Sequence, residues 1–479
     1  MSIGSALSNA LSGLGAAAKS AELISSNVSN ALTPGYAKRD LIVSSRHSSQ
    51  GGVKIDGVLR QEDTVIIKER RLADAKNEQS SARSLFFDNL IKLIGETGSG
   101  NTLSDDISNL ESKLIEASGL PKDTNRLRAV FNAASAVAQR FNKISNGIQK
   151  ERLQADNTIN EQVKALNTSL NALKKLNQQI VTAQSLSKNT ASLMDKRNQL
   201  LDKISKILPV KIFDRGEGKM SLYSTSGQML LDSTVAKISF EPTRSLNSHS
   251  DVKNQTLSKL LIEGQANVSN FDLKLAGGTL AAAFEIRDAI GPEMQSTLDD
   301  LAMNVAKTLG NSEIDPSLGE NDPGLFTDRG ANATSNNLAG FSARLEINER
   351  VDPSKGGALW RIREGIGIAS SVDEGSADLL VKLAEALGHE SPGAGSQEMS
   401  IFDQTSFLLS DVTLQSADAE TEAVFNSSFL KDLKLREQSH AVNTDQEMQH
   451  LLQVKQAFTA NAKIIQAADE MLSLILKLK

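Results

Sequence analysis

Two stretches decide the fold of this chain, ISSNVSNALTPGY at residues 24–36 and QAFTANAKIIQAADEML at residues 456–472. Each lies in a segment whose apolar residues recur at alternating spacings of four and three, so each predicts a helix with one narrow apolar stripe. The first helix must end within its stretch. Pro34 biases Thr33 towards an extended conformation, and Gly35 permits a turn directly after it.

The two apolar stripes require partners, because a single stripe cannot bury itself. The partner is either the other end of the chain or a neighbouring copy, and we expect a terminal coiled coil that serves assembly. The alternative is an ordinary core-facing stripe. Thr444 and Glu447 form a capping box that predicts the start of the last helix. The expected assembly seam comprises Leu7, Leu14, Ala21, Ile24, Val28, Leu451, Val454, Phe458, Ile465 and Leu472.

Together these two stretches resemble the termini shared by bacterial flagellar rod, hook and hook-associated proteins. SNVSNALTPGY carries the N-terminal signature, and QAFTANAKIIQAADEML carries the C-terminal one. Phe458 stands where the family usually has tyrosine, a departure that keeps the aromatic ring. The residues that match the family motifs are Asn27, Asn30, Thr33, Pro34, Gly35, Tyr36, Asn461, Gln466 and Asp469.

The resemblance implies a structural protein that connects hook to filament by self-assembly through its terminal helices. The implied partners are further copies of the chain, the hook protein, a second junction protein next to the filament, and a cytosolic export chaperone on the C-terminal helix. The implied location is extracellular, at the hook–filament junction, after type III export. Two alternatives stay open: another flagellar axial protein, such as a hook or distal rod subunit, and a coiled-coil scaffold without a flagellar role.

Composition agrees with an exported assembly subunit. The chain has 479 residues, no cysteine, a net charge of −6 and only 4% aromatic residues. The absence of cysteine excludes disulfides and thiolate metal sites. Without a basic tract carrying aromatic residues we expect no nucleic-acid partner, and without a long apolar run we expect no membrane span. The N-terminus lacks the pattern of a cleaved secretory signal.

A long helical region follows the first stretch. Helices are expected at residues 62–94 and 103–117, and a third begins near Asp123. Its apolar stripe runs from Leu127 to Ile180 with one eleven-residue step, which is a stutter in the heptad pattern. Because neither glycine nor proline occurs between Gly147 and Pro209, the sequence predicts that this helix continues to Pro209. We expect this stripe to face an intramolecular bundle.

Alternating patterns after Pro209 predict β-structure. One hairpin is expected around residues 215–218, and a second alternating segment runs through residues 345–362 around a Pro-Gly-rich turn. Helices are expected at residues 279–309, at residues 376–387 and from Phe402 onwards.

The expected fold is therefore mainly α with a β-containing insert, in an elongated, nested, multi-domain arrangement. The layers are a terminal coiled coil, a helical-bundle middle and a mixed α/β or β outer domain. The expected domains are residues 1–35 and 440–479 for terminal assembly, 36–208, 276–335 and 402–439 for the helical middle, and 209–275 and 336–401 for the outer domain.

The sequence contains few candidate catalytic, metal-binding or cofactor-binding motifs. The five histidines show no pair at helical metal spacing, and the acidic residues 315–322 lack the alternating ligands of a calcium loop. A phosphate-binding glycine motif is also missing. A fused peptidoglycan hydrolase would need two carboxylates in a cleft, whereas the carboxylates here follow helix surfaces. We expect no enzymatic activity, no cofactor and no metal.

Overall fold

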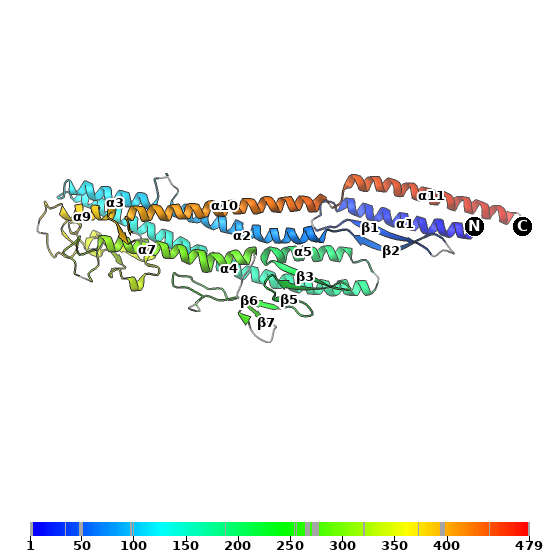
Figure 1. The fold of residues 1–479 in the computed structure, drawn as a ribbon, viewed down its shortest axis with the longest axis horizontal. Helices are drawn as coiled ribbons and strands as arrows, with labels where there is room; N and C mark the ends of the chain where they lie inside the picture. The colour runs from blue at the N-terminus through cyan, green and yellow to red at the C-terminus, as the bar shows by residue number, and fades with distance from the viewer. Residues whose placement is uncertain are drawn as a thin grey trace.

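The computed structural model describes residues 3–33, 35–46, 51–95, 98, 100–186, 188–252, 254, 256–263, 269–270, 277–319, 321–371, 373–392, 398–439 and 441–477. The molecule is an elongated bundle in which both termini lie at one end (Figure 1). The helices are α1 (Ile3–Ser29), α2 (Thr64–Ile94), α3 (Leu103–Ser118), α4 (Thr124–Ser185), α5 (Ala191–Ile207), α6 (Gly278–Glu285), α7 (Gly291–Leu309), α8 (Arg361–Glu364), α9 (Asp378–Gly388), α10 (Ile401–Ser439) and α11 (Thr444–Lys477).

The strands form small antiparallel sheets. They are β1 (Arg39–Ser45), β2 (Val53–Arg60), β3 (Val210–Gly216), β4 (Lys219–Ser224), β5 (Met229–Leu231), β6 (Lys237–Ser239), β7 (Leu261–Glu263), β8 (Ser269–Asn270), β9 (Phe326–Asp328), β10 (Leu345–Ile347), β11 (Ser391–Pro392) and β12 (Glu398–Met399). β1 pairs with β2, β9 with β10 and β11 with β12, while β3-β4-β5 and β6-β7-β8 are three-stranded. The hairpin expected around residues 215–218 is confirmed as β3–β4.

α4 is the axis of the molecule. It has 62 residues, which corresponds to a length of about 90 Å. Its first half lies in a hydrophobic core with α3, α7, α9 and α10, and its second half lies in another core with α5, α6 and the sheets β3 to β7. The buried positions of α4 follow the apolar stripe of the sequence from Leu127 to Ile180. The expected intramolecular bundle is therefore confirmed for this helix.

The continuous helix expected up to Pro209 is wrong. α4 ends at Ser185, and α5 starts at Ala191 and packs back against it. The intervening segment is rich in serine, asparagine and threonine, whose side chains compete for backbone hydrogen bonds. The Ala191 amide donates to Asn189 Oδ1 at 2.9 Å, which ties the start of α5 to this turn. Polar side chains thus end the helix without glycine or proline.

The alternating segment 345–362 is the second correction. β10 pairs with β9 rather than with the residues after the turn, and Arg361–Glu364 form the short helix α8. Trp360 does not belong to a strand. Asn348 fixes the end of β10, because its side-chain amide donates to the carbonyls of Pro323 and Gly324 at 3.0 and 2.9 Å. The segment therefore returns to the turn before β9.

The two segments expected to form one outer domain, residues 209–275 and 336–401, have different packing partners. Residues from β3 to β7 share their core with the second half of α4, whereas residues 341–366 share theirs with the first half and with α7. The hairpin β1–β2, which the sequence analysis did not anticipate, packs on α1.

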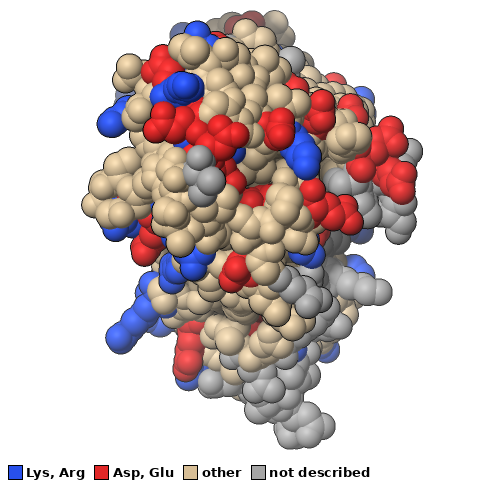
Figure 2. Space-filling model, turned by 90° about the vertical axis from the view of Figure 1, so that its left-hand side faces the viewer, with Lys and Arg blue, Asp and Glu red and all other residues tan. Residues whose placement is uncertain are grey.

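Acidic side chains gather on the end of the molecule opposite the termini (Figure 2). Residues 311–400 contain fifteen acidic and seven basic residues. No helix among the described residues combines the length and apolarity that a membrane crossing requires. Within the same described part, no group of three or more His, Asp or Glu side chains is placed to hold a metal ion.

Candidate assembly site

The two terminal helices pack against each other. Gly13 of α1 faces Asn461 of α11, and Asn27 of α1 bonds to Glu447 of α11. Residue numbers increase along α1 in the direction in which they decrease along α11, so the two helices are antiparallel. The two terminal helices therefore lie side by side, although more than 400 positions separate Asn27 from Glu447. The stretch at residues 24–36 lies level with the start of α11, and the stretch at residues 456–472 lies level with the first half of α1.

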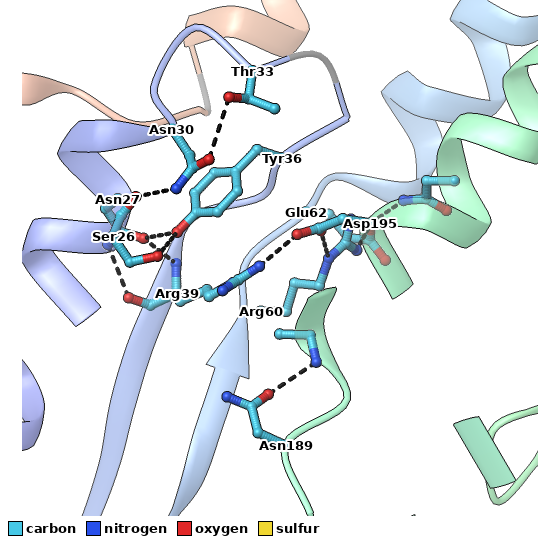
Figure 3. Close-up of polar contacts among 12 residues, drawn as sticks. Ser26, Asn27, Asn30, Thr33, Tyr36, Arg39, Arg60, Glu62, Asn189 and Asp195 are labelled. Atoms are coloured by element: carbon cyan, nitrogen blue, oxygen red, sulfur yellow. Dashed lines mark hydrogen bonds and ion pairs between the residues drawn. The ribbon is translucent and has the colours of Figure 1, made fainter. Parts of the chain in front are cut away.

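Asn27 is the centre of a buried polar junction at the inner end of this pair. Its side chain has 0% exposure. Its Nδ2 donates to Glu447 Oε2 at 2.9 Å and to the Arg39 carbonyl at 3.0 Å. Its Oδ1 accepts from Tyr36 Oη at 2.9 Å and from the Arg39 amide at 3.0 Å. Both donors and both acceptor positions of the amide are therefore used. Figure 3 shows the contacts of Asn27 with Tyr36 and Arg39.

The residues around Asn27 shape the turn after α1. Asn30 Nδ2 donates to the Ser26 carbonyl at 2.9 Å, and Thr33 Oγ1 donates to Asn30 Oδ1 at 3.3 Å. Gly35 has a φ of +78°, which glycine adopts without strain. Pro34 lies outside the described residues. These contacts aim Tyr36 back at Asn27 (Figure 3).

Glu447 links this junction to α11. Besides accepting from Asn27, it pairs with Lys38 Nζ at 3.1 Å, and its own side chain is 1% exposed. The capping box expected from Thr444 and Glu447 is therefore wrong, because Glu447 points into the junction. Asn443 caps α11 instead: its Oδ1 accepts from the amides of Asp445 and Gln446 at 3.0 and 3.1 Å.

A second ionic contact attaches the terminal pair to the helical body. Asp195 of α5 accepts from Arg39 Nη2 at 2.6 Å and from Arg60 Nε at 2.8 Å, so the two arms of the β1–β2 hairpin meet on one carboxylate. The Arg39 guanidinium lies 4.6 Å from the centre of the Tyr36 ring, which is cation–π distance. Arg60 also pairs with Glu62. The turn after α1 is thereby coupled to α5.

A third cluster lies nearby, where α2, α5 and α10 meet. Arg70 contacts Asp74, Asp202 and Glu437 at 2.6 to 2.8 Å. Burial raises the pKa of Glu437, while the neighbouring Arg70 guanidinium opposes that shift. Since Glu437 lies near the end of α10, this cluster fixes the helix just before the chain turns into α11.

The expected seam residues are covered to different degrees. Ile24 is buried, whereas Leu7, Leu14, Ala21, Val28, Leu451, Val454 and Ile465 are half-buried. Phe458 and Leu472 remain 42% and 40% exposed. The pairing of α1 with α11 thus covers the stripe only in part and leaves Phe458 and Leu472 of α11 accessible.

The motif residues separate into two groups. Asn27, Asn30, Gly35, Tyr36 and Asn461 are buried or half-buried, while Thr33, Gln466 and Asp469 are exposed. A Cβ atom at Gly13 would lie 2.8 Å from Nδ2 and from Oδ1 of Asn461, so glycine permits the close approach of the two helices there. The N-terminal motif therefore builds the junction, and Asn461 builds a close helix contact.

Sequence analysis did not identify Lys38, Arg39, Arg60 and Asp195, and it gave Glu447 another role. One signal was available for Glu447. It lies four residues before Leu451, so it occupies a position of the apolar stripe. A charge at such a position indicates a buried partner. The pairing with Asp195 carried no comparable signal, because it depends on how α5 folds back.

The family models match two parts of the chain. The flagellar hook-associated protein FlgK helical domain matches residues 87–313, and the flagellar basal body rod FlgEFG protein C-terminal region matches residues 438–478. The chain belongs to the flagellar hook-associated protein family. It is therefore a structural component of the bacterial flagellum that serves motility, and the family is a structural one. Residues 438–478 include the whole of α11.

Similar proteins carry the same description. Flagellar hook-associated protein 1 of Bacillus subtilis is 22% identical over 94% of this chain and 93% of that protein. The Salmonella typhimurium protein of that name is 23% identical over 63% of this chain, and the match spans 55% of its length. A flagellar hook junction protein structure from Burkholderia pseudomallei has 17% identity and a TM-score of 0.45, covering 54% of this chain and 46% of that one.

Proposed function

We propose that this chain connects hook to filament as a junction subunit and that neighbouring copies join through the α1–α11 pair. The observation that carries the proposal is the exposed apolar surface of α11. Beyond the seam residues, this helix exposes Met448, Leu452, Ile464, Met471, Leu474, Ile475 and Leu476. So many exposed apolar side chains on one helix indicate a protein interaction site. In our proposal the assembling unit comprises residues 1–35 and 440–479.

The position of this surface supports the same assignment. α1 and α11, with the β1–β2 hairpin packed on α1, form an extension at one end of the molecule, and the bundle of α2, α4 and α10 lies beyond the polar junction (Figure 1). Isolated helices are marginal in water without tertiary packing. Two helices alone cannot bury all apolar residues of α11, so further helices from neighbouring copies would complete the packing. The junction around Asn27 then sets the direction in which the pair leaves the body.

The partners follow from this arrangement. We propose that the pair contacts the hook protein on one side and a second junction protein on the filament side, outside the cell. Before export, the exposed stripe of α11 would be held by a cytosolic chaperone that binds an amphipathic helix in a groove. Removing residues 446–479 should abolish that binding, and binding that survives the truncation would contradict the assignment.

The substitution Ile465→Asp tests the assembly role directly. It places a charge in the half-buried part of the seam, where burial without a partner costs several kcal/mol. Cells carrying it should build hooks, release unpolymerised flagellin and fail to swim. The matched variant Ile465→Val keeps an apolar side chain and should swim. Circular dichroism of both purified variants should match the original chain, because the body has its own cores.

The outcomes separate the candidate functions. Normal filaments with Ile465→Asp exported would show that the stripe is not the assembly seam. Missing hooks would instead place the chain among the hook or distal rod subunits, which is the alternative axial role. Immunolabelling of isolated flagella gives the position of the chain independently of either variant.

A further inference from the structure

A second apolar surface lies on α10, away from the terminal pair. Phe407, Leu414, Phe425 and Phe429 follow one another at spacings of seven, eleven and four, so they share one helix face. All four are exposed, Phe425 to 67%. The rings of Phe425 and Phe429 are stacked with centroids 6.4 Å apart. We call this set the α10 stripe.

The α10 stripe is flanked by acidic residues. Asp418 and Glu422 are exposed on the same side of the helix, and between Ile401 and Leu430 the helix contains no basic residue. Two such faces from two copies would bring like charges together, which costs free energy. The surface therefore favours a basic partner over a second copy of itself.

A basic face of that kind runs along α4. Its exposed residues Arg128, Lys143, Lys150, Lys164 and Lys175 are spaced by fifteen, seven, fourteen and eleven, so they lie on one side of the helix, opposite the buried stripe. Glu161 is an acidic residue on this face. We call it the α4 face.

The α10 stripe and the α4 face lie at the same height along the molecule. Gly147 of α4 abuts Leu93 of α2, and Asn89 Nδ2 donates to Glu151 Oε1, so α2 and α4 are antiparallel. Arg83 of α2 lies 3.9 Å from Glu422 of α10. At about 1.5 Å per residue, Glu422 therefore lies level with about residue 157 of α4. In Figure 1, α10 follows the upper edge of the molecule, and the second half of α4 follows the lower side.

We propose that the α10 stripe of one copy packs against the α4 face of the next copy. Lysine stems cover aromatic rings while their ammonium groups reach carboxylates such as Asp418 and Glu422. The contact joins two different surfaces, so it repeats from copy to copy and produces a ring or helical array rather than a closed pair. Because both surfaces lie at one height, copies in the same orientation match side by side.

This inference rests on the proposed function in one respect, namely that several copies assemble in the flagellum. Because the chain has no cysteine, single engineered thiols report contacts without background. Two differently tagged variants are co-expressed. One carries Thr421→Cys on α10, and the other carries a single cysteine on α4, introduced as Asn146→Cys, Asn157→Cys or Thr168→Cys. Isolated flagella are treated with a short bismaleimide, and adducts are read by immunoblot against both tags.

We expect an adduct between the two tags for at least one α4 position, and none for Ser112→Cys, an exposed residue of α3. Adding Asp418→Lys and Glu422→Lys to the α10 variant should lower the adduct yield several-fold while the chain stays in the flagella. The inference would be overturned if cross-links formed only between two copies of the α10 variant, or if no α4 position gave a cross-link to α10. Either result would leave the proposed function intact. Absence of the chain from flagella would overturn both.

Discussion

α4 and α11 carry the same kind of apolar stripe, but the stripe of α4 is buried and the stripe of α11 is partly exposed. In α4, Ile159, Leu166 and Leu170 are completely buried, whereas in α11 Phe458 keeps 42% of its surface exposed. The difference lies in the number of neighbours. α4 packs against α2, α3, α5, α6 and α7, but the main partner of α11 is α1. Periodicity therefore shows that a helix has an apolar face, and the surrounding elements decide whether that face is core or interface.

Polar residues mark the same contrast. In α4, Arg152 and Asp156 fall within the eleven-residue step of the stripe, and Asp156 pairs with buried Arg287 at 2.7 Å. In the terminal pair, Asn27 and Glu447 form the buried polar contact. The ion pair between Asp156 and Arg287 lies between the two apolar cores that α4 joins. The contact between Asn27 and Glu447 instead lies at the end of an apolar stripe that is only partly covered. Truncation experiments on both stripes test this distinction.

The largest difference is expected for truncation of a seam position in each helix. Leu166→Ala leaves a cavity in a closed core and should lower the free energy of unfolding by about 2–5 kcal/mol. Phe458→Ala in the purified, unassembled chain should cost only about 1–2 kcal/mol, because 42% of the residue is already exposed to water. Chemical denaturation monitored by circular dichroism measures both. Equal losses would mean that the terminal seam is already closed in the free chain.

The sequence predicted most helices and the β3–β4 hairpin of this fold, because long periodic segments and turn signals are strong. It placed the end of α4 too late. The signal there was a run of serine, lysine, asparagine and threonine around Asn189, and reasoning from glycine and proline alone missed it. The strand pairing of β10 was equally hidden, since it depends on Asn348 reaching carbonyls more than twenty residues earlier.

The candidate site was predictable in part. The turn at Gly35 and Tyr36 followed from local rules, and the seam positions followed from spacing. The links from Asn27 to Glu447 and from Arg39 to Asp195 join segments more than 150 residues apart. No local pattern encodes such distances, so the three-dimensional fold was needed to find them. Glu447 alone interrupted a periodic stripe and so gave a readable signal.

A smaller effect is expected at the polar junction. Asn27→Ala removes four hydrogen bonds and leaves the buried Glu447 carboxylate without one donor, which should destabilise the α1–α11 pair by about 1–3 kcal/mol. Hydrogen exchange of α11 amides in the purified chain measures this loss. Asn30→Ala is the matched control, because its bonds are local and part-exposed, and it should cost less. Similar exchange in both variants would contradict the central role of Asn27.

The contributions of Asn27 and Glu447 to the stability of the α1–α11 pair should also be coupled. If the contact between them is the main link, the double variant with Glu447→Ala should lose less than the sum of the two single losses. Additive losses would instead mean that Glu447 acts mainly through Lys38, its other partner at 3.1 Å.

The smallest effect is expected at two neighbouring glycines of α1. Around Gly15 no atom lies within 4 Å of an added Cβ, so Gly15→Ala should stabilise the helix by about 0.5–1 kcal/mol through reduced backbone entropy. At Gly13 the same methyl group would lie 2.8 Å from the Asn461 amide, whose Nδ2 donates to the Ala457 carbonyl. Asn461 must move and lose that bond, so Gly13→Ala should bring no gain. Adding Asn461→Ala should restore the gain in Gly13→Ala, as read by hydrogen exchange of α1 amides. If Gly13→Ala alone matched Gly15→Ala, the two helices would not approach each other closely at Asn461.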